Sequence, residues 1–73
     1  MIITLTEFEH ERPCYVPTTY IDSMTMREDS HYKRFTRIHI KNPNDGFEYD
    51  IDVKETIKVI KGIMEAKKNE QAR

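Results

Sequence analysis

The chain has 73 residues, of which 37% are hydrophobic and 34% are charged, and its formal net charge is −1. A chain of this length forms one domain and buries only about 60% of its unfolded surface, so a large core and a roomy catalytic cleft are excluded. A net charge near zero argues against nucleic acid as a partner.

The chain begins with a β-branched, partly alternating run, Ile2–Phe8, which predicts a first strand. Ile3 and Leu5 share one face of this strand, and the residues at its two ends lie on the other face. After a polar turn, the segment Pro13–Pro17 predicts a short second strand. Because a proline stands at each end, this segment is not helical and we expect it at the edge of a sheet.

Residues 18–20 predict a single turn, and the alternation from Ile21 to Met26 predicts a third strand. One of its faces carries Ile21, Ser23 and Thr25, and the other carries Asp22, Met24 and Met26. A polar loop over 27–33 leads to a fourth strand that begins at Arg34 or Phe35. We expect the inward residues of this strand to be Thr36, Ile38 and Ile40, and the outward residues to be Arg37 and His39.

The strongest strand signal follows the turn residues Asn42–Gly46. In it, the apolar residues Phe47, Tyr49, Ile51 and Val53 alternate without exception with Glu48, Asp50, Asp52 and Lys54. This alternation predicts a fifth strand with one apolar and one charged face, joined to the fourth in an antiparallel hairpin.

After Val53 the period changes to that of a helix. One helical stripe holds Ile57, Ile60, Met64 and Lys67, with Val59, Ile63 and Ala66 at its edges. Two caps fit the helix start, either Asp52 with Glu55 or Thr56 alone. Gly62 costs about 1 kcal/mol relative to alanine, so it marks either a close contact with the sheet or a tolerated residue.

Together these elements predict an α+β fold, with a small antiparallel β-sheet of four to five short strands followed by one C-terminal amphipathic helix. We expect residues 1–66 to form a single compact domain. Residues 67–73 are charged and have no apolar anchor, so we expect a frayed or disordered tail.

Three stretches of the chain resemble the FlbD-like family of small domains, also called SwrD-like in flagellar contexts. They are Ile3–Thr6, which resembles the opening strand of the family, Pro13–Ile21, which resembles its extended strand and polar turn, and Val53–Ile63, which resembles the passage into its final helix. The chain departs from the family at Glu9–Glu11, where an Asn-Gly turn is usual, and at Thr18, where Asn is usual. The resemblance implies the fold, and the family has no known catalytic residues to carry over.

The sequence offers few groups for chemistry. The histidines and Cys14 lack the spacing of a zinc site, so we predict no metal and no cofactor. Cys14 is better explained as a small buried apolar residue than as a nucleophile. The acidic residues Glu48, Asp50 and Asp52 fit a solvated strand face better than an acid–base site. We therefore predict that the protein is not an enzyme.

The best candidate binding surface is a strip of aromatic and basic residues, Tyr32, Lys33, Arg34 and Arg37. Tyrosine and arginine are enriched at binding hot spots, and such strips also bind single-stranded nucleic acid. The plain alternative is ordinary strand residues with a basic flank.

We therefore expect a small protein-interaction module that binds a larger protein, such as a phage inhibitor of a host machine or a bacterial accessory factor. The alternative is a nucleic-acid-binding protein that uses this strip. We also expect homo-oligomers through an open strand edge. The single cysteine favours a cytoplasmic location, and no run approaches the ~18 apolar residues of a membrane span.

Overall fold

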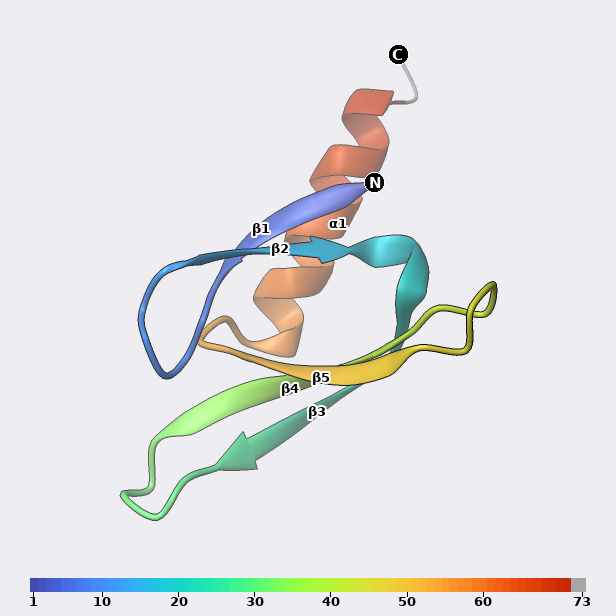
Figure 1. Ribbon diagram of the computed structural model, residues 1–73. Coiled ribbons are helices and arrows are strands. Elements are labelled where there is room, and N and C mark those ends of the chain that lie inside the picture. Colours follow the sequence, from blue (N-terminus) through green and yellow to red (C-terminus); the bar gives the residue numbers. More distant parts are fainter. Residues whose placement is uncertain (72–73) are drawn as a thin grey trace.

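A computed structural model describes residues 1–71 of the chain (Figure 1). In chain order its elements are β1 (Ile2–Thr6), β2 (Pro13–Pro17), the 3-10 turn η1 (Thr18–Tyr20), β3 (Ile21–Glu28), β4 (Arg34–Lys41), β5 (Glu48–Val53) and α1 (Ile57–Gln71). The predicted α+β class, with antiparallel strands and a C-terminal helix, is confirmed.

The strands form two small sheets rather than the single predicted sheet. β1 pairs with β2, and β3, β4 and β5 form a second sheet in that order, all antiparallel. The sheets meet at an isolated bridge between Glu7 and Val53. There the amide of Phe8 donates to the carbonyl of Asp52 at 3.0 Å. The first strand of the prediction therefore ends early, because its last residues turn onto β5.

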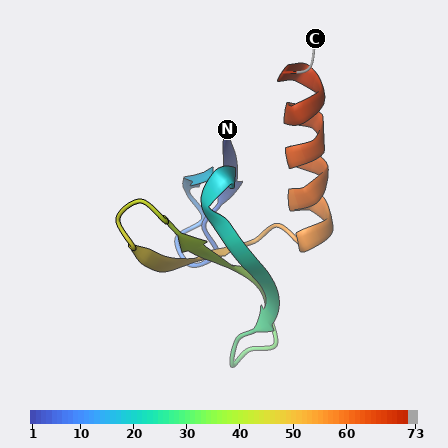
Figure 2. The same ribbon diagram turned by 90° about the vertical axis from the view of Figure 1, so that its right-hand side faces the viewer.

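A small core lies where the two sheets and the helix meet (Figure 2). Its buried apolar residues are Ile3, Leu5, Val16, Ile38, Ile40, Val53 and Ile60. The predicted inward residues of the fourth strand are all buried, and so are Ile3 and Leu5, which were predicted to share one face of the first strand. Alternation thus grouped the residues of these two strands correctly.

β3 differs from the simple alternation that the sequence predicts. A β-bulge between Ile21 and Ser23 shifts the register, so that Ile21 pairs with Ile40 while Met24 pairs with Ile38. Opposed residues share a face, so Ile21 and Met24 both point toward the core, although they were predicted on opposite faces. The strand also continues to Glu28, which makes the following loop shorter than predicted.

The β4–β5 hairpin forms as predicted, and Gly46 adopts a positive φ of 71° in its turn. The apolar face of β5 is buried only at one end. Val53 is fully buried, whereas Tyr49 is 41% and Phe47 is 62% exposed, with their ring centroids 5.6 Å apart. The hairpin extends past the core, since so small a chain has nothing to cover its far end.

Thr56 caps the helix. Its hydroxyl oxygen accepts a hydrogen bond from the amide of Val59 at 3.2 Å, and its carbonyl accepts the bond from Ile60 at 2.9 Å. This decides between the two predicted caps. Gly62 is exposed, and a Cβ added there would meet no other part of the described chain within 4 Å, so this glycine marks no close contact with the sheet.

On the predicted stripe, Ile60 is fully buried, Ile57 and Met64 are half-buried, and Lys67 is exposed. The helix continues past Ala66 to Gln71, and the last two residues of the predicted tail lie outside the described residues. Its second half extends away from both sheets (Figure 2).

The molecule is elongated, with principal extents of 43 × 28 × 19 Å and a radius of gyration of 12.7 Å. A compact chain of this length would have a radius of gyration of about 11 Å. Within residues 1–71, no helix has the length and apolar character needed to cross a membrane.

Candidate binding surfaces

Two residues of the predicted strip lie in the turn between β3 and β4. Tyr32 is 84% exposed and has a positive φ of 61°. The Asp29 carboxylate organises this turn, since its Oδ1 accepts hydrogen bonds from the amides of His31 and Lys33, each at 2.9 Å. These bonds, that of Lys33 first, lower the pKa of Asp29. The turn therefore holds the tyrosine ring out in solvent.

The other two residues of the strip lie on opposite faces of β4. Arg34 is an odd number of residues from Arg37, and successive strand residues point to opposite faces. Arg37 is also engaged within the fold. Its Nε and Nη2 atoms donate to the two carboxylate oxygens of Asp52 at 2.8 and 3.1 Å, and its guanidinium lies 5.8 Å from the ring centre of Phe35. The four residues thus do not form one surface.

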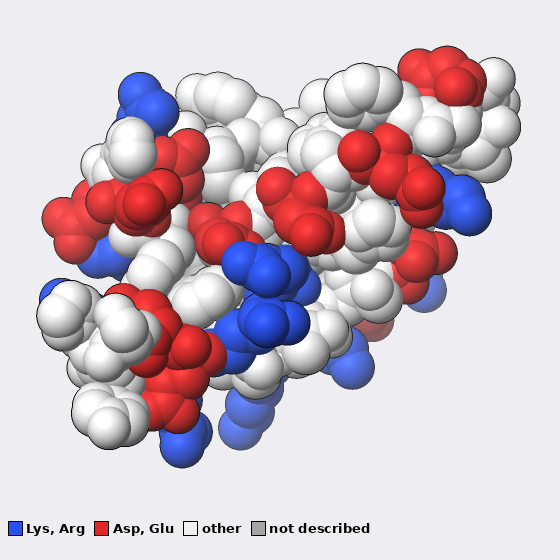
Figure 3. Space-filling view, turned by 60° about the horizontal axis from the view of Figure 1, so that its bottom comes forward, with Lys and Arg blue, Asp and Glu red and all other residues white. Residues whose placement is uncertain are grey.

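Arg37 belongs to a ladder of charged pairs on the outer face of the β3–β4–β5 sheet. His39 lies between two carboxylates, with Nδ1 2.8 Å from Asp50 and Nε2 3.2 Å from Glu48. Lys41 follows, 4.0 Å from Glu48. Figure 3 shows positive and negative side chains interspersed over the underside of the molecule. This face is balanced in charge and does not resemble a nucleic-acid-binding surface.

We expect the pKa of His39 to lie above its ordinary value of about 6.5. The hydrogen bond to Asp50, followed by that to Glu48, raises this pKa. Only the protonated ring has two N–H donors, so the two contacts together favour the cation. The resulting stabilisation is full below about pH 6.5 and is lost as the pH rises through the raised value in the folded protein.

An NMR titration of the His39 ring measures this pKa directly. Asp50→Asn is expected to lower the titration midpoint, whereas the control Glu65→Gln, on the exposed part of the helix, leaves it unchanged. A midpoint at or below about 6.5 in the unmodified protein would contradict the predicted pairing.

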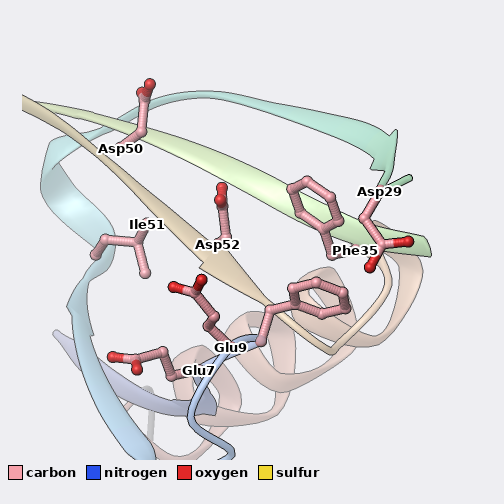
Figure 4. A pocket seen from close by; sticks show the side chains of 8 residues that line it. Glu7, Glu9, Asp29, Phe35, Asp50, Ile51 and Asp52 are labelled. Carbon is pink, nitrogen blue, oxygen red and sulfur yellow. The ribbon is translucent and has the colours of Figure 1, made fainter. Parts of the chain in front are cut away.

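A groove of about 500 Å³ lies between β5 and the turn after β1 (Figure 4). It is lined by Glu7, Phe8, Glu9, Asp29, Phe35, Asp50, Ile51 and Asp52. The rings of Phe8 and Phe35 stack with their centroids 4.7 Å apart and form part of its lining. The groove is acidic and was not predicted from the sequence, because its residues come from four separate segments.

Most of the carboxylates in the groove already hold partners within the fold. Asp52 binds Arg37, Asp50 binds His39, and Glu7 lies 3.4 Å from Arg12. These groups therefore hold the segments of each hairpin together.

Cys14 does not have the environment of a nucleophile. Its side chain is half-buried, and desolvation raises the pKa of the thiol, as do the nearby carboxylates of Glu55 and Glu7. A raised pKa keeps the thiol protonated and unreactive near neutral pH. Among the residues that the structure describes, no group of three or more histidine, cysteine, aspartate or glutamate side chains is placed to hold a metal ion.

A surface whose own residues are all uncharged lies on the opposite side of the β1–β2 hairpin from the core. We call it the β1–β2 outer face, and its residues are Ile2, Thr4, Thr6, Pro13, Tyr15 and Pro17. These residues pair directly across the two strands, so they share one face. Tyr15 is 69% and Ile2 is 60% exposed. The sequence signal that we missed is the absence of charge at alternate positions of both strands.

Comparisons with protein families, with curated proteins and with solved structures find no match for this chain. The resemblance to the FlbD-like family therefore stays a prediction.

Proposed function

We propose that this chain is a non-enzymatic protein-interaction module that binds a larger protein through the β1–β2 outer face. The observation that carries the proposal is the composition of this face. In a chain with 34% charged residues, six positions on two paired strands carry no charge, and they expose a tyrosine and an isoleucine.

Such a composition fits a protein partner. The centres of protein interfaces are depleted in charged residues and enriched in tyrosine, and tyrosine is a frequent hot spot. Exposed apolar patches on small soluble proteins commonly mark interaction sites. We therefore expect Tyr15 to be the main anchor, with Ile2 and the flanking prolines around it.

The face is also held in place by the core behind it. The alternate residues of the same strands, Ile3, Leu5 and Val16, are at most 2% exposed. Proline at positions 13 and 17 fixes φ at both ends of β2. A surface that is ordered before binding loses less conformational entropy on binding, which favours affinity.

The small size of the chain suits an accessory role. A domain of this kind changes the behaviour of a larger protein by occupying part of its surface, as a phage inhibitor or a bacterial accessory factor would in the cytoplasm. In this proposal, any catalytic activity belongs to the larger partner protein.

Matched tyrosine variants test the proposal. The bait carries its tag at the C-terminus, because the N-terminal residue directly precedes Ile2. We expect a protein captured from a lysate of the source organism by the unmodified chain to be lost with Tyr15→Glu and retained with Tyr32→Glu. Both tyrosines are highly exposed, at 69% and 84%. With purified partners, Tyr15→Ala should weaken binding by about 30-fold, the effect of a hot spot of about 2 kcal/mol.

The opposite result would identify the strip predicted from the sequence. Loss of capture with Tyr32→Glu and retention with Tyr15→Glu would refute the role of the β1–β2 outer face. The nucleic-acid alternative has its own test, a gel shift at low salt, where binding through phosphate contacts is strongest. We expect no retardation, since Arg37 is already paired with Asp52.

A further inference from the structure

The pattern of hydrogen bonds shows which backbone groups of β3 remain free. In an antiparallel pair, residues alternate between those that bond to the neighbouring strand and those that point away. The amide of Asp29 donates to the carbonyl of Lys33 at 2.9 Å, in register with the β3–β4 ladder. The backbone hydrogen bonds from β3 to β4 are therefore formed by Arg27, Thr25 and Ser23. The backbone groups of Met24, Met26 and Glu28 point outward, away from the sheet.

The outer edge of β2 is closed to pairing by its prolines. The amide of Glu7 donates to Arg12 at 2.8 Å, and that of Thr18 donates to Met1 at 3.0 Å, in register with the β1–β2 ladder. By the same alternation, the backbone groups of Pro13, Tyr15 and Pro17 point away from β1, toward the free edge of the hairpin. Only Tyr15 has an N–H to offer, and an edge of this kind resists the addition of another strand.

The edge of β1 is partly occupied by other parts of the fold, and the edge of β5 is negatively charged. On β1, the Glu55 carboxylate accepts a bond from the amide of Thr6, and the Thr6 carbonyl accepts one from Lys54, each at 2.9 Å. On β5, the outward residues Glu48 and Asp50 carry negative side chains. A second copy of β5 would place the same charges opposite them.

We propose that β3 pairs with β3 of a second copy of this chain, in an antiparallel arrangement with two-fold symmetry. Every residue of β3 from Thr25 to Glu28 is exposed, and the strand contains no proline that would close its edge. A two-fold antiparallel pairing is self-complementary, so one edge supplies both donors and acceptors. The result is a continuous sheet of six strands, and this inference does not depend on the proposed function.

The charges of β3 disfavour two registers, and we propose a pairing centred on Met26, in the exposed half of the strand. A two-fold axis at Thr25 would bring Asp22 opposite Glu28 of the other copy, and an axis at Arg27 would bring the two arginines together. With the axis at Met26, no like charges lie directly opposite. Met26 then faces its own copy, Met24 faces Glu28, and the three outward residues of each strand form about six hydrogen bonds in total.

Sedimentation and amide hydrogen exchange on the unmodified protein test the pairing without any substitution. We expect a dimer to appear as the concentration rises from about 20 μM to about 1 mM. Over the same range, exchange at the amides of Met24, Met26 and Glu28 should slow, while exchange at the outward amide of Tyr15 should not. A monomer throughout, or a dimer without slowed exchange at β3, would overturn the proposal.

A pair of substitutions at Met26 separates the backbone from the side chain. Met26→Pro removes the outward N–H without removing a bond to β4, so the dissociation constant of the dimer should rise at least about tenfold. Met26→Leu keeps the N–H and should change the dissociation constant of the dimer by no more than about twofold. A folded Met26→Pro variant that dimerises normally refutes the pairing. If that variant does not fold, as circular dichroism would show, the exchange experiment decides.

Discussion

Replacing Ile60 by alanine is expected to lower the free energy of unfolding by about 2–5 kcal/mol, the range for removing a large aliphatic side chain from a core. Ile60 is the residue of α1 that is fully buried, and its cluster contains side chains of both sheets. The cavity left by alanine would therefore lie where the helix meets the two sheets. We expect this loss to consume much of the stability of so small a domain.

Urea denaturation followed by circular dichroism measures the effect, and Val59→Ala is the matched control. Val59 is the neighbouring β-branched residue on the same helix but is 49% exposed, so its truncation should change stability by less than about 0.5 kcal/mol. A helix of 15 residues is marginal alone. Loss of helical signal should therefore accompany unfolding of the sheets. Equal effects of the two substitutions would show that α1 is not anchored by Ile60.

Glu55 is expected to have the second-largest effect, with Glu55→Ala costing about 2–3 kcal/mol. One carboxylate oxygen accepts a hydrogen bond from the amide of Thr6, and the other accepts one from the Thr6 hydroxyl, each at 2.9 Å. The main-chain carbonyl of Glu55, which alanine retains, accepts a separate bond from the buried hydroxyl of Thr36 at 2.7 Å. Hydrogen bonds to a charged group contribute about 1.5–3 kcal/mol. Glu55 thus ties β1 and β4 to the start of the helix.

Two further variants of glutamate residues test whether the loss of stability in Glu55→Ala comes from the hydrogen bonds to its charged carboxylate. Glu55→Gln retains a neutral acceptor and should lose about half as much, because charge-assisted bonds are roughly twice as strong as neutral ones. Glu65→Ala, on the exposed part of the helix, should be within about 0.5 kcal/mol of the unmodified protein. The measurement is again urea denaturation. A Glu55→Ala variant as stable as Glu65→Ala would show that the hydrogen bonds from Thr6 to the Glu55 carboxylate contribute nothing to stability.

The two proposed surfaces lie on different sheets and are compatible with each other. Pairing through β3 leaves the β1–β2 outer face of each copy uncovered. A dimer would carry two such faces, and simultaneous binding to a partner with repeated sites would raise the avidity without any new contact. The oligomeric state and the partner should therefore be measured together.

Much of the fold follows from local patterns. The alternation of Ile38 and Ile40 with Arg37 and His39 identified the inner face of β4, because a strand turns successive side chains to opposite faces. The change of period after Val53 placed the helix within a few residues of its true start. Turn residues at 42–46 placed the hairpin.

The candidate site was less predictable. The strip from Tyr32 to Arg37 looked continuous in the sequence, but its arginines point to opposite faces of β4 and one of them is bound to Asp52. The opposite orientation of the two arginines could have been predicted from the sequence, since residues an odd number of positions apart on a strand point to opposite faces. The pairing with Asp52 depended on the register between β4 and β5, which local composition does not report.

The sequence by itself determined the elements, their order and, outside the bulged strand β3, which side chains share a face. Only the tertiary structure decided which of those faces is covered. Val53 and Tyr49 belong to one alternating face, yet one is fully buried and the other is 41% exposed. The physical reason is that periodicity arises from the backbone of a single element. Burial instead depends on which distant segments pack against it, and here the chain at the end of β1 meets β5 near Val53, at the bridge between Glu7 and Val53.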